Sequence, residues 1–522
     1  MSAKVNESGE QAKEGPELFF GLIGAVGTDL DPVQGALTRS LSYVGYETRV
    51  LVLSSILREF EKWKDLPTEP LDSHINEHMN AGSELRKITG KGDALAVLAM
   101  QQIRNVRNDK LGDGGKTIPK CTYIFRSLKN PEEVRTLRRV YGAGSWIISA
   151  YSPRETRIKR LADKIAQTHH ESRPDKFMPD SQALVRRDEY EADNGLGQDV
   201  SETFAMADIF INASDSDGLT FAVRRFIEAL FHYPFHTPTR DENGMFHANA
   251  SALRSSSLAR QVGAAISTQD GDIVSVGSND VPKVGGGLYW PGETDSRDFK
   301  LGHDASDRLK RDVLWDVLQR LRDANWFMKP IAKLKQNKMI EQALPIIEDA
   351  RLMDLIEFGR SVHAEMTAML NAAHRGVSVK DCILYTTTFP CHDCARSIVA
   401  AGIRRVVYIE PYPKSLAGEL HEDSILIDSP KTNKDRVNFE PFVGIAPSRY
   451  MDLFSMVKRK EADGAIVSWK ESGALPRYAG SSPTYLRSEA ESVAILWRKL
   501  GSEGLKFVES EDQVKVGGKS KG

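Results

Sequence analysis

The sequence predicts an α/β protein with two differently patterned regions. Three observations support this fold class. The chain has 522 residues, enough for two to four domains of ordinary size. Its 40% hydrophobic and 27% charged residues are typical of a soluble globular protein. Short apolar runs alternate with helical patterns along most of the chain, which indicates sheets covered by helices.

Composition also argues against several classes of protein. The formal net charge is −2, so no overall positive field recruits nucleic acid. No apolar run approaches 18 residues and the first 16 residues are polar, so we expect neither a membrane span nor a signal peptide. Four cysteines in so long a chain are not a disulfide framework. These features predict a cytoplasmic protein without a membrane partner.

The first region extends from residue 17 to 235, after a predicted disordered tail at 1–16. Residues 17–24 (ELFFGLIG) form an apolar run that predicts a buried strand. A helix is expected over 31–46, because Pro32 suits its first turn and Gly45 its end. Further strands are expected at 46–54, 120–128, 144–152 and 206–214, with a helix at 130–142. This alternation predicts a parallel sheet wrapped by helices.

The second region extends from 236 to 455, and 456–522 reads as an extension that ends in a flexible tail. A helix leading into a strand is expected over 247–268, followed by a turn at 269–272 and a partner strand at 273–279. Residues 285–298 form a Gly-rich loop, and 303–360 are mostly helical in pattern. The order helix, strand, helix, strand then follows at 363–376, 381–387, 391–402 and 404–411.

Two short motifs in this second region predict a zinc site. His363 and Glu365 are separated by one residue, and Pro390 precedes Cys391 and Cys394. Cysteines three apart share one face of a helical turn, and a helix start lowers thiol pKa values. With His363 they supply three ligands and leave a fourth position for water, as in catalytic zinc sites. We therefore expect one zinc ion per chain, with Glu365 carrying protons between the water and the substrate.

Other interpretations of the cysteine pair are weaker. A redox-active pair or half of a structural zinc site would not explain the His-Ala-Glu motif. A structural site would need a fourth ligand, and Cys382 lies in an apolar strand pattern where burial is expected. Cys121 is likewise expected in a buried strand, and His374 and His392 are treated as surface or packing residues. H-x-E with P-C-x-x-C is the signature of zinc deaminases.

The resemblance to deoxycytidylate deaminases extends beyond these ligands. The segments VHAEMTAML, ILYTTTFPCHDCARSIVAAGIRRVVYIEPY and ARQVGAAISTQDGDIVSVGSNDVP resemble that family. The resemblance implies a cytidine-deaminase-like α/β/α sandwich, with Asn279 holding the sugar of the substrate. The chain departs from the family in two ways: Thr367 stands where an asparagine is usual, and about 60 extra residues separate the motifs.

The glycine stretch FFGLIGAVGTDLDP resembles the phosphate-binding loop of nucleotide kinases. It follows an expected strand and opens an expected helix, as that motif requires. Aligned on Gly24, however, the second glycine is Asp29, the lysine is Leu30 and the Mg²⁺-binding hydroxyl is Asp31. The resemblance implies a P-loop kinase-like domain that no longer phosphorylates. Its glycine turn remains a weak candidate for nucleotide binding, through Gly24, Gly27 and Thr28. Alternatively, the glycines only pack a strand against a helix.

A degenerate kinase-like domain followed by a deaminase-like domain resembles the bacterial anti-phage dCTP deaminases. The resemblance implies that free dCTP, and often dCMP, becomes dUTP or dUMP, which depletes a pool needed by phage. It also implies control by a small RNA or a nucleotide at the N-terminal domain, and we expect a homo-oligomer. Three alternatives remain: a housekeeping dCMP deaminase that supplies dUMP, a polynucleotide cytosine deaminase, and a zinc-stabilised binding module. The preferred phosphate state stays open.

Overall fold

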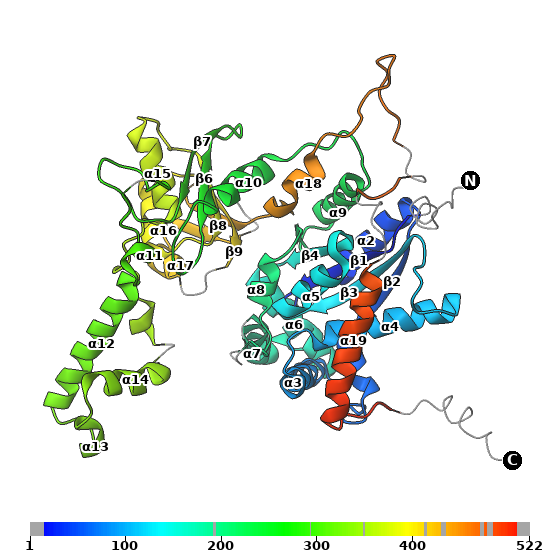
Figure 1. Ribbon diagram of the computed structural model, residues 1–522, viewed down its shortest axis with the longest axis horizontal. Helices are drawn as coiled ribbons and strands as arrows, with labels where there is room; N and C mark the ends of the chain where they lie inside the picture. Colours follow the sequence, from blue (N-terminus) through cyan, green and yellow to red (C-terminus); the bar gives the residue numbers. More distant parts are fainter. Residues whose placement is uncertain are drawn as a thin grey trace, which may run out of the picture. The chain divides into compact units, whose positions relative to one another are not determined.

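The computed structural model divides the chain into two compact units, of which residues 1–239 with 443–522 form unit 1 and 240–442 form unit 2 (Figure 1). It describes residues 15–189, 191, 195–292, 294–347, 350–411, 415–429, 435–469, 474–477 and 484–508. The predicted tails at 1–16 and at the chain's end lie almost wholly outside these residues. Residues 443–455, which the sequence interpretation assigned to the second domain, cluster with unit 1.

Unit 1 is built on a six-stranded sheet in the described residues, with strand order β12-β5-β4-β1-β3-β2. All pairs are parallel except the short β12 against β5. The strands are β1 (Leu18–Gly24), β2 (Glu47–Val52), β3 (Cys121–Leu128), β4 (Ser145–Tyr151), β5 (Ile209–Asn212) and β12 (Gly444–Ile445). The first five are the strands that the apolar runs predict.

The helices of unit 1 cover this sheet, and the core contains the buried side chains of β1, α2 and α9. They are α2 (Asp31–Tyr43), α3 (Leu71–Thr89), α4 (Ala94–Leu111), α5 (Pro131–Tyr141), α6 (Arg154–Thr168), α7 (Met178–Glu189), α8 (Val200–Ala205), α9 (Ser216–Leu230), α18 (Tyr450–Phe454) and α19 (Tyr485–Ser502). Helix α5 begins where its sequence predicts, because Asn130 caps its first turn and Glu133 closes a capping box.

Unit 2 has a second six-stranded sheet in the part of the chain that the structure describes, in the order β10-β11-β9-β8-β6-β7. Strands β6 and β7 form an antiparallel hairpin, β6 also pairs antiparallel with β8, and the remaining pairs are parallel. The strands are β6 (Gly263–Ser267), β7 (Ile273–Ser278), β8 (Ile383–Thr388), β9 (Arg405–Glu410), β10 (Ile425–Ile427) and β11 (Val437–Pro441).

Two glycines let helices approach opposite faces of the second sheet. A Cβ on Gly263 would lie 1.9 Å from the carbonyl oxygen of Ala248 in α10, and one on Gly277 would lie 2.3 Å from that of Ala364 in α15. Gly277 pairs with Ala264, and neighbouring residues of a strand point to opposite faces. Helices α10 and α15 therefore cover opposite faces, which gives unit 2 the three layers that the resemblance implies.

The helices of unit 2 are α10 (Arg240–Ala252), α11 (Asp298–Leu301), α12 (Ala305–Asp323), α13 (Lys329–Ala332), α14 (Gln336–Ile347), α15 (Ala364–His374), α16 (His392–Ala400) and α17 (Ala417–Leu420). The helix expected to begin at 247 begins at Arg240 and ends at Ala252, so a loop separates it from β6. The segment 303–360 is helical as its pattern predicts, and α12 to α14 extend beyond the sheet of unit 2 (Figure 1). Among the described helices of both units, none combines the length and apolarity needed to cross a membrane.

Candidate metal centre

Two helix starts bring the residues of the zinc motifs together. His363 is the N-cap residue of α15, and Cys391 is the N-cap residue of α16. Cys394 lies in the first turn of α16, so both thiols face the start of their helix. Strand β8 ends at Thr388, and only Phe389 and Pro390 separate it from Cys391. The carboxyl end of the central strand β8 therefore positions both cysteines.

The three ligand atoms have the spacing of a zinc site. His363 Nδ1 lies 3.3 Å from Cys391 Sγ and 3.4 Å from Cys394 Sγ. Zn–S and Zn–N bonds of about 2.3 and 2.0 Å in a tetrahedron place sulfur and nitrogen about 3.5 Å apart. All three side-chain atoms lie within 4.8 Å of one another, and theirs is the one group of this kind found among the described residues. The donor set therefore fits zinc and leaves one tetrahedral position open.

The contacts within the cluster stabilise one thiolate. The hydrogen bond with Cys394, assisted by His363, lowers the pKa of Cys391 to about 4. The same pairing raises the pKa of Cys394 well above its ordinary value, and the hydrogen bond to Cys391 raises the pKa of His363 to about 9. Cys391 is therefore prepared to bind a cation, because the thiolate is the form that ligates metals.

Glu365 lies beside this cluster without belonging to it. It occupies the first turn of α15, two residues after His363, and its side chain is buried. Burial raises the pKa of its carboxyl group. A carboxyl group with a raised pKa accepts a proton more readily, which suits a group that must take up and return protons. This is the chemistry that the sequence assigned to Glu365, and the role itself stays a prediction.

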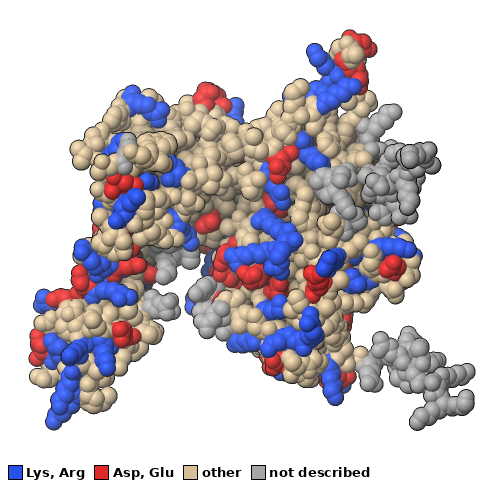
Figure 2. Space-filling view, viewed as in Figure 1, with Lys and Arg blue, Asp and Glu red and all other residues tan. Residues whose placement is uncertain are grey.

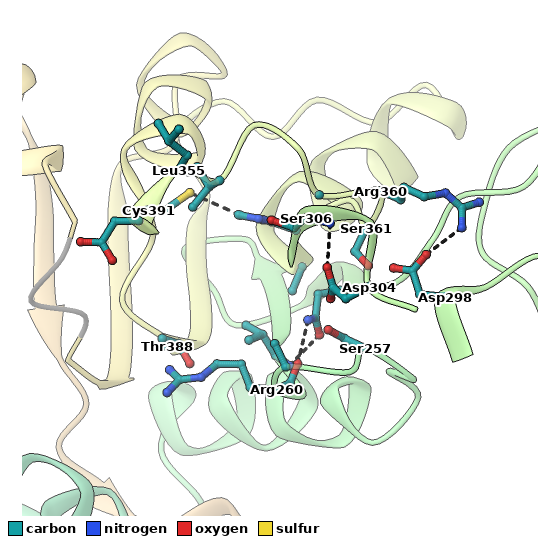
Figure 3. Close-up of a pocket in the computed structure, with 18 of the residues that line it drawn as sticks. Ser257, Arg260, Asp298, Asp304, Ser306, Leu355, Arg360, Ser361, Thr388 and Cys391 are labelled. Carbon is teal, nitrogen blue, oxygen red and sulfur yellow. Dashed lines mark hydrogen bonds and ion pairs between the residues drawn. The ribbon is translucent and has the colours of Figure 1, made fainter. Parts of the chain in front are cut away.

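The cluster opens into a cavity of about 570 Å³. Figure 3 shows Cys391 on one side of this cavity and the ion pair of Arg360 with Asp298 on another. Its lining consists of Ser257, Ala259, Arg260, Val262, Asn279, Asp298, Asp304, Ser306, Lys310, Met353, Asp354, Leu355, Ile356, Gly359, Arg360, Ser361, His363, Ala364, Glu365, Thr388, Phe389 and Cys391. This volume falls within the range of about 300–1,000 Å³ typical of small-molecule sites.

Sequence reasoning did not identify the wall formed by residues 303–360. Nine of the lining residues lie in this segment, including Lys310 and Arg360. No motif marks them, because they come from helix α12 and from the separate segment 353–360. Arg260 and Thr388 were also missed, although both lie within segments that carry the resemblance.

Asn279 lies in the cavity wall, but backbone groups already engage its side chain. Its Oδ1 accepts a hydrogen bond from Val262 N at 2.7 Å, and its Nδ2 donates to the Arg260 carbonyl at 2.8 Å. Asn279 therefore holds the segment 260–262 against the cavity. One N–H and one lone pair remain on its amide, so the predicted contact with a sugar stays a prediction.

The remaining cysteines and histidines occupy the places expected of non-ligands. Cys121 is the first residue of β3 and Cys382 directly precedes β8, and both are buried. Neither these cysteines nor His374 and His392 belong to the cluster of metal-binding side chains found in the described residues.

The glycine turn of unit 1 borders a separate cavity of about 250 Å³, which Gly24, Gly27 and Thr28 line. Two backbone groups of the glycine turn already have partners, whereas the buried hydroxyl of Thr28 has none among the described residues. The amide of Val26 donates to Asp188 Oδ2 at 2.6 Å, and Lys129 Nζ donates to the carbonyl of Gly24 at 2.9 Å and ion-pairs with Asp188. The carboxylate of Asp188 therefore already accepts the hydrogen bond from a backbone amide that a phosphate would need.

Two further residues of this turn are explained by packing. Leu30, at the position of the kinase lysine, is buried in the core of unit 1. Gly27 has φ +86°, and a Cβ there would lie 2.5 Å from the carbonyl oxygen of Arg157 in α6. The glycine is thus required by a close approach of two backbones.

Comparisons with known proteins concern the region of the metal centre. Residues 238–410 match the family model described as "Cytidine and deoxycytidylate deaminase zinc-binding region". The deoxycytidylate deaminase of Enterobacteria phage T4 is 38% identical over 86 residues, which cover 15% of this chain and 43% of that protein. The phage T2 enzyme is 44% identical over 57 residues (11% and 30%), and the human one 40% over 47 residues (9% and 25%). The chain spans less than half the length of these relatives.

Among solved structures, a dCMP deaminase from cyanophage S-TIM5, in complex with dCMP and dUMP, is 17% identical with a TM-score of 0.22. The match covers 40% of this chain and 99% of the cyanophage protein. Together with the geometry of the cluster, the family model identifies residues 238–410 as a deoxycytidylate-deaminase-like zinc-binding region.

Proposed function

We propose that unit 2 hydrolytically deaminates the cytosine ring of free deoxycytidine nucleotides, converting dCMP to dUMP and dCTP to dUTP. One observation carries this proposal: His363, Cys391 and Cys394 are clustered so that they could hold a zinc ion, and His363 and Cys391 line one cavity together with the buried Glu365. The relatives reported above are all named deoxycytidylate deaminases. Their names support cytosine as the base and deoxyribose as the sugar of the substrate.

The reaction needs a water molecule and a carrier for its protons. Zinc held by the three ligands would lower the pKa of a bound water to about 7. The water oxygen forms a bond to C4 of cytosine, the exocyclic C–N bond breaks, and ammonia leaves as the carbonyl forms. Glu365 transfers both protons of the water in turn, the first to the ring nitrogen N3 and the second to the departing amine. Its burial suits this work, because the raised pKa brings the carboxyl group nearer to neutral pH.

A free nucleotide is the substrate we favour over a polynucleotide. The base of a free nucleotide reaches the site without unstacking, whereas a duplex base must be flipped out at a cost of a few kcal/mol. The chain carries a net charge of −2, and basic and acidic side chains are interspersed over the visible face in Figure 2. A groove that tracks a nucleic-acid backbone would need a continuous basic surface.

We further propose, from the pairing of the two domains, that the protein lowers cytoplasmic dCTP as an antiviral defence against phage. In this proposal unit 1 is a kinase-like domain that no longer phosphorylates and that responds to a small RNA or a nucleotide, and the chain assembles as a homo-oligomer. Two features support the loss of phosphoryl transfer: Leu30 is buried, and the carboxylate of Asp188 from α7 accepts a hydrogen bond from the glycine turn. The alternative is a housekeeping enzyme that supplies dUMP.

The deciding experiment is incubation of the zinc-loaded chain with dCMP, dCDP, dCTP, CTP or single-stranded DNA, followed by product analysis. Release of ammonia and formation of the uracil nucleotide from dCMP or dCTP is the expected result. Uracil in the DNA with untouched mononucleotides would instead identify a polynucleotide deaminase. No deamination of any substrate would favour the zinc-stabilised binding module.

The antiviral and housekeeping roles differ in the cell. Production of the protein during phage infection should lower dCTP and raise dUTP or dUMP, and it should protect the bacterium only while Glu365 is intact. A normal dCTP pool with a raised dUMP supply in uninfected cells would favour the housekeeping role.

A further inference from the structure

The insertion at 303–360 is part of the zinc cavity and not an appendage to it. Helix α12 contributes Ser306 and Lys310 to the wall, and the segment before His363 contributes Met353 and Arg360. The residues around Cys391 and Glu365 form another part of the same cavity. A molecule whose base reaches Glu365 therefore meets the insertion with its remaining groups.

The charged residues of this wall differ in whether they already have partners. Arg360 pairs with Asp298 at 2.7 Å and also donates to the Ser296 carbonyl at 3.0 Å. Asp304 caps α12 by accepting hydrogen bonds from the amides of Ser306 and Asp307. Lys310 is half-buried and has no hydrogen bond or ion pair within the described part of the chain. It is therefore the cation of this wall that can bind an incoming anion without breaking a contact seen here.

The position of Lys310 suits the phosphate end of a nucleotide. Lys310 follows Ser306 by four residues in α12, so both side chains lie on the same face of the helix. Figure 3 shows Ser306 and Asp304 between Cys391 and the pair of Arg360 with Asp298. If the cytosine ring lies next to Cys391, the sugar and its phosphate extend along the cavity. They then meet the wall that includes Lys310.

We propose that Lys310 binds the phosphate of the nucleotide, and that the insertion thereby makes the site selective for nucleotides over nucleosides. This inference rests on the proposed function. An ammonium group is a compact charge that forms strong, charge-assisted hydrogen bonds to phosphate oxygens. Half-burial reduces the screening of this charge, so the contact is worth more than one on an open surface. A nucleoside has no phosphate and gains nothing from it.

Binding of reaction products tests this proposal without turnover. The zinc-loaded full chain is titrated by calorimetry with dUMP and with deoxyuridine. In Lys310→Ala we expect about tenfold weaker binding of dUMP and unchanged binding of deoxyuridine. Lys310→Arg should retain most of the preference for dUMP. The matched control is Arg308→Ala, which removes the same charge from an exposed position of α12 outside the cavity lining and should change neither affinity.

Steady-state kinetics gives a second measurement. Lys310→Ala should raise KM for dCMP and dCTP about tenfold and leave kcat within about twofold, because the phosphate contact is the same in substrate and transition state. The proposal is overturned by an unchanged ratio of dUMP to deoxyuridine affinity in Lys310→Ala, by an equal loss in Arg308→Ala, or by a wild type that binds both products alike. A wild type that prefers dUMP but deaminates neither dCMP nor dCTP would leave this inference standing and refute the proposed function.

Discussion

At the scale of single residues, the metal centre depends on where two helices begin. His363 and Cys391 are N-cap residues, so each side chain projects from the start of a helix instead of its flank. Cys394 and Glu365 then follow within the first turns. The four side chains of the two motifs thus come together at the helix starts. Three of them are the expected metal ligands, and the fourth is the expected proton carrier.

The first prediction separates these tasks at Glu365. Glu365→Gln should lower the deamination rate by about 10²–10⁴-fold, because the amide side chain cannot transfer a proton. Zinc content should stay near one ion per chain, since Glu365 is not among the three clustered ligands. Metal analysis and a single-turnover assay of the same preparation check both parts. A Gln variant that loses its zinc would show that Glu365 is itself a ligand.

The second prediction concerns the ligands. Cys391→Ser should lose both zinc and activity, because it removes the thiol with the lowered pKa and leaves His363 and Cys394 alone. Cys382→Ser is the matched control: this cysteine is also buried in unit 2 but lies outside the cluster, so zinc content should be retained. Removal of zinc from the wild type with a chelator should abolish activity, and added zinc should restore it. Equal zinc loss in both cysteine variants would contradict the ligand assignment.

At the scale of elements, close packing explains features that looked functional in the sequence. The turn after β1 resembles a phosphate-binding loop, but α6 fills the space at Gly27 and Asp188 accepts a hydrogen bond from the amide of Val26. In unit 2, Gly277 permits α15 to lie directly on β7, and His363 is the N-cap residue of that helix. A glycine in a close contact thus helps to position the metal ligand His363.

A third prediction follows for the glycine turn. Gly27→Ala should destabilise unit 1 by about 2–4 kcal/mol, because it adds positive-φ strain to a clash with the Arg157 backbone. Gly501→Ala in α19 should be neutral or slightly stabilising, since no atom lies within 4 Å of its added Cβ. Denaturant unfolding followed by circular dichroism compares the two variants. An unaffected Gly27→Ala protein would mean that α6 can move away from the turn.

At the scale of the whole molecule, the chain leaves unit 1 at Thr239, forms unit 2 and returns to unit 1 at Val443. The returning segment adds β12 to the edge of the first sheet and lays α19 against α4 (Figure 1). A buried ion cluster joins these distant segments: Arg107 of α4 contacts Glu17 at 2.8 Å and Glu489 of α19 at 2.7 Å. Both ends of the described chain therefore contribute to the stability of unit 1.

The fourth prediction tests this cluster. Arg107→Met should destabilise unit 1 by about 3–5 kcal/mol, because it removes the cation that contacts the buried carboxylate of Glu17 and leaves Glu489 with only the longer, 3.9 Å ion pair to Arg104. Arg487→Met on α19 is the control: its ion pair with Glu491 is exposed, and its loss should cost less than about 1 kcal/mol. Unfolding midpoints of the two variants give the comparison. Similar midpoints would show that the buried cluster contributes no more than a surface pair.

The sequence by itself predicted β1 to β9, some of the helices and the metal motif, whereas β10, β11 and β12 were not predicted. Short segments of sequence are enough to predict these features. A buried strand appears as an apolar run, and a ligand pair such as Cys391 and Cys394 appears as a spacing within one helical turn. The apolar runs therefore predicted the five parallel strands of unit 1. The motif predicted the cluster of His363, Cys391 and Cys394, while the catalytic role of Glu365 and the sugar contact of Asn279 remain to be tested.

Only the tertiary structure decided which distant residues meet. It showed that Asp188 occupies the amide of Val26, that 443–522 belongs with unit 1, and that Lys310 of the insertion lines the zinc cavity. Contacts of this kind join residues that are tens to hundreds of positions apart, and neither periodicity nor spacing encodes them. They arise when whole elements pack, because the burial of one helix face selects its neighbours and so determines which polar side chains come within reach of each other.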